Sequence, residues 1–167
     1  MLSQQALIDE FLRVRKNSEH LCKPLEIEDY GLQAMANTSP PKWHLAHTSW
    51  FFETFVLKAF CREYRQWAPA YEHLFNSSYN GIGKPFDRPS RGLLSRPTVA
   101  EVYRYRKAMD EQVLALLDSR EGEQQTLRDR IELGLHHEQQ HQELILTDLK
   151  YCLPVNPIQP AYRDPEP

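Results

Sequence analysis

Two histidines spaced four residues apart are the residues of this sequence best suited to hold a metal ion. His137 and His141 lie in a stretch with helical periodicity. Because an α-helix turns about 100° per residue, two residues four apart project roughly 40° from each other and lie one turn apart along the axis. Imidazole is a good ligand for divalent transition metals. The spacing therefore predicts that both rings bind one metal ion.

A second group of histidines lies far upstream and offers a third ligand. His44 and His47 both belong to this group, and helical geometry alone does not choose between them. Only His20 and His73 lie outside the two groups, although the chain has seven histidines. The second group is part of the aromatic motif Trp43-His44-Leu45-Ala46-His47.

The residues from His137 to His141 also fit H-E-x-x-H, the signature of zinc peptidases, in which Glu138 would be the general base. Such a peptidase needs a further ligand downstream and a strand that holds the peptide. The sequence after Tyr151 is rich in proline, and no strand pattern occurs. The peptidase is therefore the weaker interpretation. His136 projects about 100° away from His137, so we expect it at the rim.

Composition excludes several classes of protein. The chain has 167 residues, enough for one domain with a hydrophobic core. Its 20 basic and 23 acidic residues form no basic stripe, which argues against a nucleic-acid partner. Its three cysteines are far apart and show no C-x-x-C pattern, as is typical of a reducing cytoplasm. The sequence shows neither a signal peptide nor an apolar run long enough for a membrane span.

The hydrophobic periodicity predicts an all-α fold with four amphipathic helices, which is the pattern of a four-helix bundle. Thr98 and Glu101 form a capping box at the start of the third helix. A long, aromatic and ordered loop is expected between the second and third helices. We expect the bundle in residues 1–153 and a proline-rich, linker-like tail in 154–167. The expected helices cover residues 3–21, 42–60, 98–117 and 124–151.

Three residues share the expected helix face with the histidine pair. Gly134 either leaves space beside a metal or allows close helix packing, and the sequence does not separate these explanations. Arg130 and Asp148 could support the metal ligands through hydrogen bonds. A salt bridge at the rim of the bundle is the simpler interpretation of both.

Three motifs together resemble the N-terminal DinB-like domain of the ergothioneine-type sulfoxide synthases, the EgtB family. The resemblance covers nearly the whole chain. The motifs are Ser39-Pro40-Pro41-Lys42-Trp43-His44-Leu45-Ala46-His47-Thr48-Ser49-Trp50-Phe51-Phe52-Glu53-Thr54-Phe55, Arg88-Pro89-Ser90-Arg91-Gly92-Leu93-Leu94-Ser95-Arg96-Pro97 and Gly134-Leu135-His136-His137-Glu138-Gln139-Gln140-His141-Gln142-Glu143-Leu144.

The resemblance implies a non-haem Fe(II) site, and it selects His47 rather than His44 as the third ligand. The ligands that it implies are His47, His137 and His141. Three imidazoles also accept zinc, nickel or copper, so the metal in a purified sample depends on supply. The family joins the sulfur of cysteine or γ-glutamylcysteine to the imidazole of hercynine with O₂.

The resemblance also implies substrate contacts. Arg88 and Arg91 match an arginine pair that contacts the thiol's carboxylates, and Gln140 matches a position on the hercynine side. Guanidinium groups suit carboxylates because they bind both oxygens at once.

The synthases continue after a stretch like Asn156-Pro157-Ile158-Gln159-Pro160-Ala161-Tyr162 into a formylglycine-enzyme-like domain with a catalytic tyrosine. That domain is absent from this sequence, so we expect little turnover unless a second domain or chain contributes. Two alternatives stay open. One is a stand-alone DinB-like thiol transferase that uses a metal without O₂. The other is a non-enzymatic metal-binding or dimerisation module, and a homodimer is compatible with each interpretation.

Overall fold

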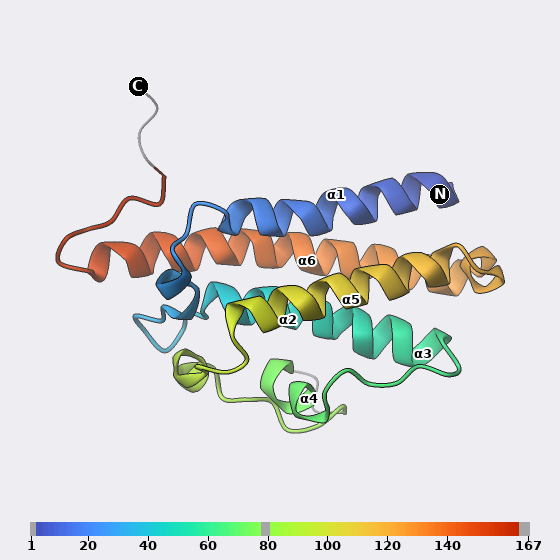
Figure 1. The fold of residues 1–167 in the computed structure, drawn as a ribbon, viewed down its shortest axis with the longest axis horizontal. Helices are drawn as coiled ribbons and strands as arrows, with labels where there is room; N and C mark the ends of the chain where they lie inside the picture. Colours follow the sequence, from blue (N-terminus) through green and yellow to red (C-terminus); the bar gives the residue numbers. More distant parts are fainter. Residues whose placement is uncertain (1–2, 78–80, 164–167) are drawn as a thin grey trace.

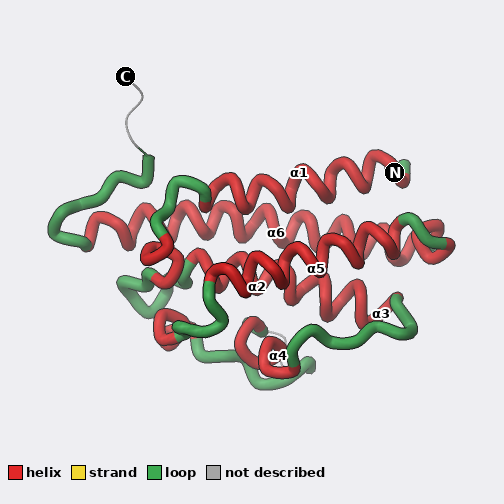
Figure 2. The backbone as a smooth tube through the Cα atoms, viewed as in Figure 1, coloured by secondary structure: helices red, strands yellow, loops and turns green. Residues whose placement is uncertain are grey.

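The computed structural model describes residues 3–77 and 81–163, and within them the chain is all-helical and has no strand, as predicted (Figure 2). The long helices run side by side, and the shorter α4 lies to one side of them (Figure 1). The α-helices are α1 (Gln4–Cys22), α2 (Pro41–Phe52), α3 (Lys58–Phe60), α4 (Pro69–Phe75), α5 (Val99–Leu117) and α6 (Gln125–Cys152).

Helix α1 begins at a side-chain cap and packs along α6. The hydroxyl of Ser3 accepts a hydrogen bond of 3.1 Å from the backbone N–H of Ala6, which satisfies one donor at the helix start. Leu7, Phe11 and Val14 are buried on the inner face. The apolar stripe predicted for this helix therefore forms its contact with the rest of the molecule.

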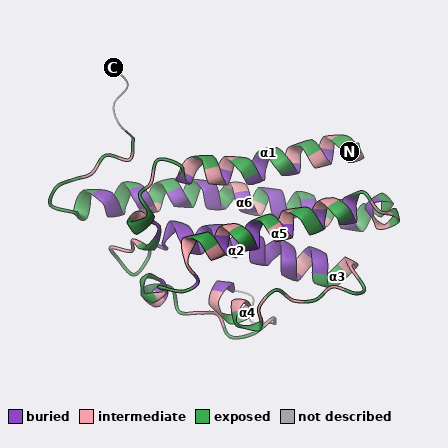
Figure 3. Ribbon diagram, viewed as in Figure 1, coloured by how far each residue is buried: buried purple, intermediate pink, exposed green. Residues whose placement is uncertain are grey.

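Helix α2 is buried along its whole length and contacts both α5 and α6 (Figure 3). Pro41 occupies its first turn, where a missing N–H costs nothing. A π-helical turn, Glu53–Leu57, joins α2 to α3. The carboxylate of Glu53 accepts hydrogen bonds from the hydroxyls of Tyr64 and Tyr105 and from the backbone N–H of Trp67. The helix predicted for residues 42–60 is thus continuous but changes its winding at Glu53.

The segment between α3 and α5 contains α4 and a 3-10 helix, Arg88–Leu93. Its described parts hold together through the buried side chain of Phe75 and a 3.1 Å hydrogen bond from the N–H of Phe86 to the carbonyl of His73. Residues 78–80, which the sequence also placed in this long loop, lie outside the described residues.

Helix α5 begins at the predicted capping box. The N–H of Glu101 donates to Thr98 Oγ1 at 3.2 Å, and the N–H of Thr98 donates to the carboxylate of Glu101 at 2.6 Å. Both contacts satisfy donors that the first helical turn leaves free. A further 3-10 helix, Arg120–Glu123, then leads into α6.

The four longest helical segments are joined by an ionic network inside the core. Glu138 on α6 is fully buried and accepts hydrogen bonds from Arg15 Nη1 at 2.7 Å, Arg106 Nη2 at 3.0 Å and Ser18 Oγ at 2.6 Å. Arg15 Nη2 also donates to Ser49 Oγ on α2 at 2.8 Å. Burial alone would raise the pKa of Glu138, but Arg15 and Arg106 lower it to about 2. The carboxylate is therefore ionised and fully paired.

The described part of the tail, residues 154–163, folds back onto the helices. The hydroxyl of Tyr162 donates to the carbonyl of Leu21 at 2.6 Å, and its ring packs beside an apolar cluster that includes Cys22 and Leu153. Residues 164–167 lie outside the described part, and the division of the chain at residue 153 stays a prediction. Among the helices of the described residues, none is both long and apolar enough to span a bilayer.

Candidate metal centre

Helices α2 and α6 bring three histidines together. One ring nitrogen each from His47, His137 and His141 lies within 4.8 Å of the others. The Nε2 atoms of His47 and His137 are 3.1 Å apart. Two ligands that bind one ion at about 2.0–2.1 Å lie roughly 3.0–3.4 Å apart, so this separation fits two ligands of one metal. The spacing of four on α6 does place its two rings on one side.

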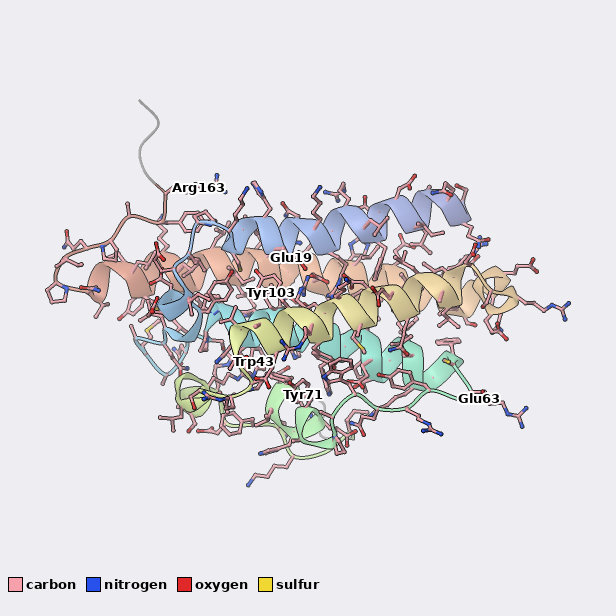
Figure 4. The ribbon with its side chains drawn as sticks, viewed as in Figure 1. Glu19, Trp43, Glu63, Tyr71, Tyr103 and Arg163 are labelled. Atoms are coloured by element: carbon pink, nitrogen blue, oxygen red, sulfur yellow. The ribbon has the colours of Figure 1, made fainter. Side chains whose placement is uncertain are left out.

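His47 is held in the orientation that leaves Nε2 free to bind a metal. Its Nδ1–H donates to the carbonyl of Phe75, which comes from the end of α4. With the proton on Nδ1, the lone pair is on Nε2. The ring stacks on Trp43 with centroids 4.6 Å apart. Trp43 projects from α2 toward α4, where its Nε1–H donates to the carbonyl of Leu74 at 2.9 Å (Figure 4).

His137 faces His47 from α6. Its ring stacks on Phe51 with centroids 4.4 Å apart. Burial lowers the pKa of His137 to about 4, because the apolar surroundings disfavour the charged ring. Its buried Nδ1 has no hydrogen-bond partner among the described residues. A neutral imidazole in this place is in the protonation state that metal binding needs.

His44 lies beside this group rather than in it. Its Nδ1 is 2.8 Å from Nδ1 of His141, and its Nε2 is 2.9 Å from Oδ2 of Asp148. Both of its ring nitrogens are therefore occupied. Burial lowers the pKa of His44 and opposes the effect of Asp148. The sequence alone left His44 and His47 as equal candidates, and the geometry separates them in favour of His47.

A cavity of about 280 Å³ is lined by two of the three histidines, His137 and His141. Arg91 is 3% exposed, and its Nη1 donates to Ser39 Oγ at 2.9 Å. Burial and the neighbouring Arg88 lower the pKa of Arg91 to about 9. The cavity thus combines metal-binding nitrogens with cationic groups that suit an anion. Its lining includes all three substrate-contact residues expected from the sequence, Arg88, Arg91 and Gln140.

Comparison with known proteins identifies the family of this chain. The sequence profile of the DinB superfamily matches residues 10–145, which is most of the chain. The chain belongs to the DinB superfamily. Domains of this superfamily often bind a metal ion, and the histidine group described above is a possible site for one. No curated protein sequence matches the chain.

In this DinB domain Glu138 is turned away from the histidines. Its carboxylate belongs to the network with Arg15, Arg106 and Ser18. A general base in H-E-x-x-H must face the metal and its bound water. The peptidase interpretation is therefore wrong, because burial and pairing hold the only carboxylate of the motif on another face of α6.

The structure also decides the open interpretations of the residues near the pair. A Cβ at Gly134 would lie 2.6 Å from Cε1 of Phe52, so this glycine allows close helix packing. His136 is exposed and lies 3.2 Å from Oε1 of Gln139, as expected at the rim. Arg130 donates to the carbonyl of Phe55 at 3.4 Å.

Two further groups shape the site, and sequence reasoning missed one of them. For Asp148 the sequence left open a support of the metal ligands or a rim salt bridge; in the structure it contacts His44 and accepts from the N–H of Ser39 at 2.9 Å. Its position seven residues after His141, on the same helix face, was the available signal. The carbonyl of Phe75 could not be predicted, because every residue has a backbone carbonyl and the residue type does not show which one faces the site.

Proposed function

We propose that this DinB domain holds iron(II) through His47, His137 and His141 and is the metal-binding part of an ergothioneine-type sulfoxide synthase. The observation that carries the proposal is the group of three imidazoles, two of which, His137 and His141, line a cavity that also contains two arginines. Iron held by these three residues would supply the redox chemistry that a reaction between a thiol and O₂ requires. The resemblance of the three sequence motifs to that family supports the specific reaction.

The residues of the chain have separate roles in this proposal. Arg91 and Arg88 bind the carboxylates of cysteine or γ-glutamylcysteine, and Gln140 contacts hercynine at the mouth of the cavity. Trp43 and Phe51 shield the histidine rings from water. Binding both reactants in one cavity supplies proximity and orientation.

The reaction forms a carbon–sulfur bond and a sulfoxide. The thiol loses its S–H hydrogen and the imidazole loses one C–H hydrogen. One oxygen atom of O₂ bonds to sulfur, and the other leaves as water with the two hydrogens. When bound, iron(II) supplies the redox chemistry for this four-electron reduction of O₂.

The experiment uses Co(II) as a spectroscopic substitute for iron. We expect cysteine or γ-glutamylcysteine to produce a thiolate-to-metal charge-transfer band in the Co(II)-loaded protein, and no band in His137→Ala. If neither thiol changes the absorption spectrum of the Co(II)-loaded protein, the proposal is overturned.

The same cavity suits a metal-dependent thiol transferase, because that reaction also needs a metal-bound thiolate and an anion site. Oxygen separates the two functions. The synthase predicts that Fe(II)-loaded protein with thiol and hercynine consumes O₂ and yields the C–S-linked product, with a second domain added if turnover requires it. Transfer of the thiol to an acceptor without O₂ would favour the transferase.

A further inference from the structure

A chain of hydrogen bonds leads from a backbone amide to one of the three histidines. The N–H of Ser39 donates to Oδ2 of Asp148 at 2.9 Å. The same oxygen is 2.9 Å from Nε2 of His44, whose Nδ1 is 2.8 Å from Nδ1 of His141. Three consecutive contacts of normal length therefore join residue 39 to the metal centre.

Each contact in this chain fixes the place of one proton. A carboxylate oxygen accepts hydrogen bonds, so the nitrogen of His44 that faces Asp148 carries the proton. In a neutral His44, Nδ1 then has only a lone pair. The contact between the two Nδ1 atoms needs one N–H, and His141 must supply it. With its proton on Nδ1, His141 has its lone pair on Nε2.

We infer that His44 and Asp148 are positioning residues that hold His141 in the tautomer whose Nε2 binds a metal ion. This inference rests on the proposed metal site and goes beyond it, because neither residue is a ligand. The histidine that could have been a third ligand acts instead through a ligand. The carboxylate of Asp148, acting through His44, also makes the imidazole of His141 more basic, which strengthens metal binding.

Burial and further hydrogen bonds hold His44 and Asp148 in place. His44 is 2% exposed, and the side chain of Asp148 is 13% exposed. The backbone amide that anchors Asp148 belongs to Ser39, and the hydroxyl of that same residue accepts from Arg91 at 2.9 Å. The cavity arginine and the metal-positioning carboxylate are thus both anchored on one residue of the segment that precedes α2.

The tautomers can be measured directly by NMR. Uniformly ¹⁵N-labelled protein gives two-bond ¹H–¹⁵N correlations that show which ring nitrogen carries the proton, and loss of signals in His44→Leu assigns that residue. We expect the proton on Nε2 of His44 and on Nδ1 of His141, in both metal-free and Zn(II)-loaded protein. A proton on Nδ1 of His44, or protons on both of its nitrogens, would overturn the inference.

Zinc affinity tests the positioning role. Removing a residue that supports a metal ligand typically costs about 10–100-fold in metal affinity. We expect such a loss in His44→Leu, and recovery of most of it in His44→Asn, whose amide oxygen can accept from His141. The control is His136→Leu on the exposed side of α6, which should bind Zn(II) as the wild type does. Equal affinity of His44→Leu and wild type would overturn the inference.

The two proposals fail in different ways. A wild-type chain with the expected tautomers that takes up no Zn(II) would contradict the metal site, and with it the metal role of His44. If the wild type binds Zn(II) and His44→Leu binds it with the same affinity, only the positioning role is contradicted. If His44→Leu does not fold, two other measurements test the positioning role. They are the tautomers of the wild-type protein and the Zn(II) affinity of His44→Asn, which we expect to be close to that of the wild type.

Discussion

The guanidinium of Arg91 lies over the indole of Trp43, with its central carbon 3.3 Å from the ring centroid. The same indole stacks on the ring of His47, with 4.6 Å between centroids. One aromatic ring therefore contacts both a buried cation and a histidine of the candidate metal centre. We therefore expect the substrate carboxylate and the metal ion to bind close to each other, both beside the indole of Trp43.

Arg91→Lys should weaken thiol binding and leave the metal in place. Lysine cannot bind both oxygens of a carboxylate, and it stacks less well on an indole. We expect at least about a tenfold loss of affinity for cysteine or γ-glutamylcysteine, or about 1.4 kcal/mol. Calorimetric titration of Zn(II)-loaded protein measures it. The control is Arg96→Lys on the same loop, and thiol affinity equal in both variants would contradict the role of Arg91.

Glu138→Gln should destabilise the fold. The change removes the buried carboxylate that Arg15 and Arg106 share, and leaves Arg15 paired only with Asp110 at 2.6 Å and Arg106 only with Glu19 at 3.5 Å. Removing one partner of a buried ion pair costs about 3–5 kcal/mol. Urea unfolding measures the free energy. The exposed Glu132 on the same helix is the matched control, because a surface change usually stays within about 0.5 kcal/mol. An unfolding free energy of Glu138→Gln as high as that of Glu132→Gln would contradict the network.

Gly134→Ala should perturb both stability and metal binding. The added Cβ would lie 2.6 Å from Phe52 and 3.3 Å from Phe51, whose ring stacks on His137. Overpacking a core typically costs about 1–3 kcal/mol. We expect a lower melting temperature and weaker Zn(II) binding. Gly31→Ala, where a Cβ meets nothing within 4 Å, should change neither. Unchanged melting and Zn(II) affinity in Gly134→Ala would show that the rings move aside without cost.

The cysteines should differ in reactivity. Burial raises the pKa of Cys22 to about 12 from an ordinary 9.0, so its thiol stays neutral where a free thiol ionises. The stability this neutral thiol contributes is complete below pH 9 and is lost as the pH rises toward 12. Half-buried Cys61 should react with a thiol reagent at pH 8 long before Cys22. Mass spectrometry of partly labelled protein measures the order, and early labelling of Cys22 would contradict its burial.

The helices could be predicted because their signals are local. The capping box at Thr98 and Glu101 and the three- or four-residue spacing of apolar positions on α1 depend only on residues close in sequence. The π-helical turn at Glu53 could not be predicted in this way. It coincides with hydrogen bonds from Tyr64 and Tyr105, which lie 11 and 52 residues further along the chain, beyond the reach of local periodicity.

The candidate site was predictable in its residue types and less so in its connections. The spacing of His137 and His141 placed two rings on one face, but periodicity could not separate His44 from His47. That distinction depends on Asp148 and the carbonyl of Phe75, which occupy one nitrogen of each ring. Glu138 shows the same limit, because its motif suggested catalysis while Arg15 and Arg106 pair it inside the core.

The most direct test of the account is the iron content of the purified chain after anaerobic loading with Fe(II). We predict one iron per chain in the wild type and in His136→Ala, and loss of bound iron in His47→Ala, His137→Ala and His141→Ala. Circular dichroism of each variant confirms that the fold persists. Iron binding that is absent from the wild type, or that survives in His47→Ala, would contradict the three-histidine centre.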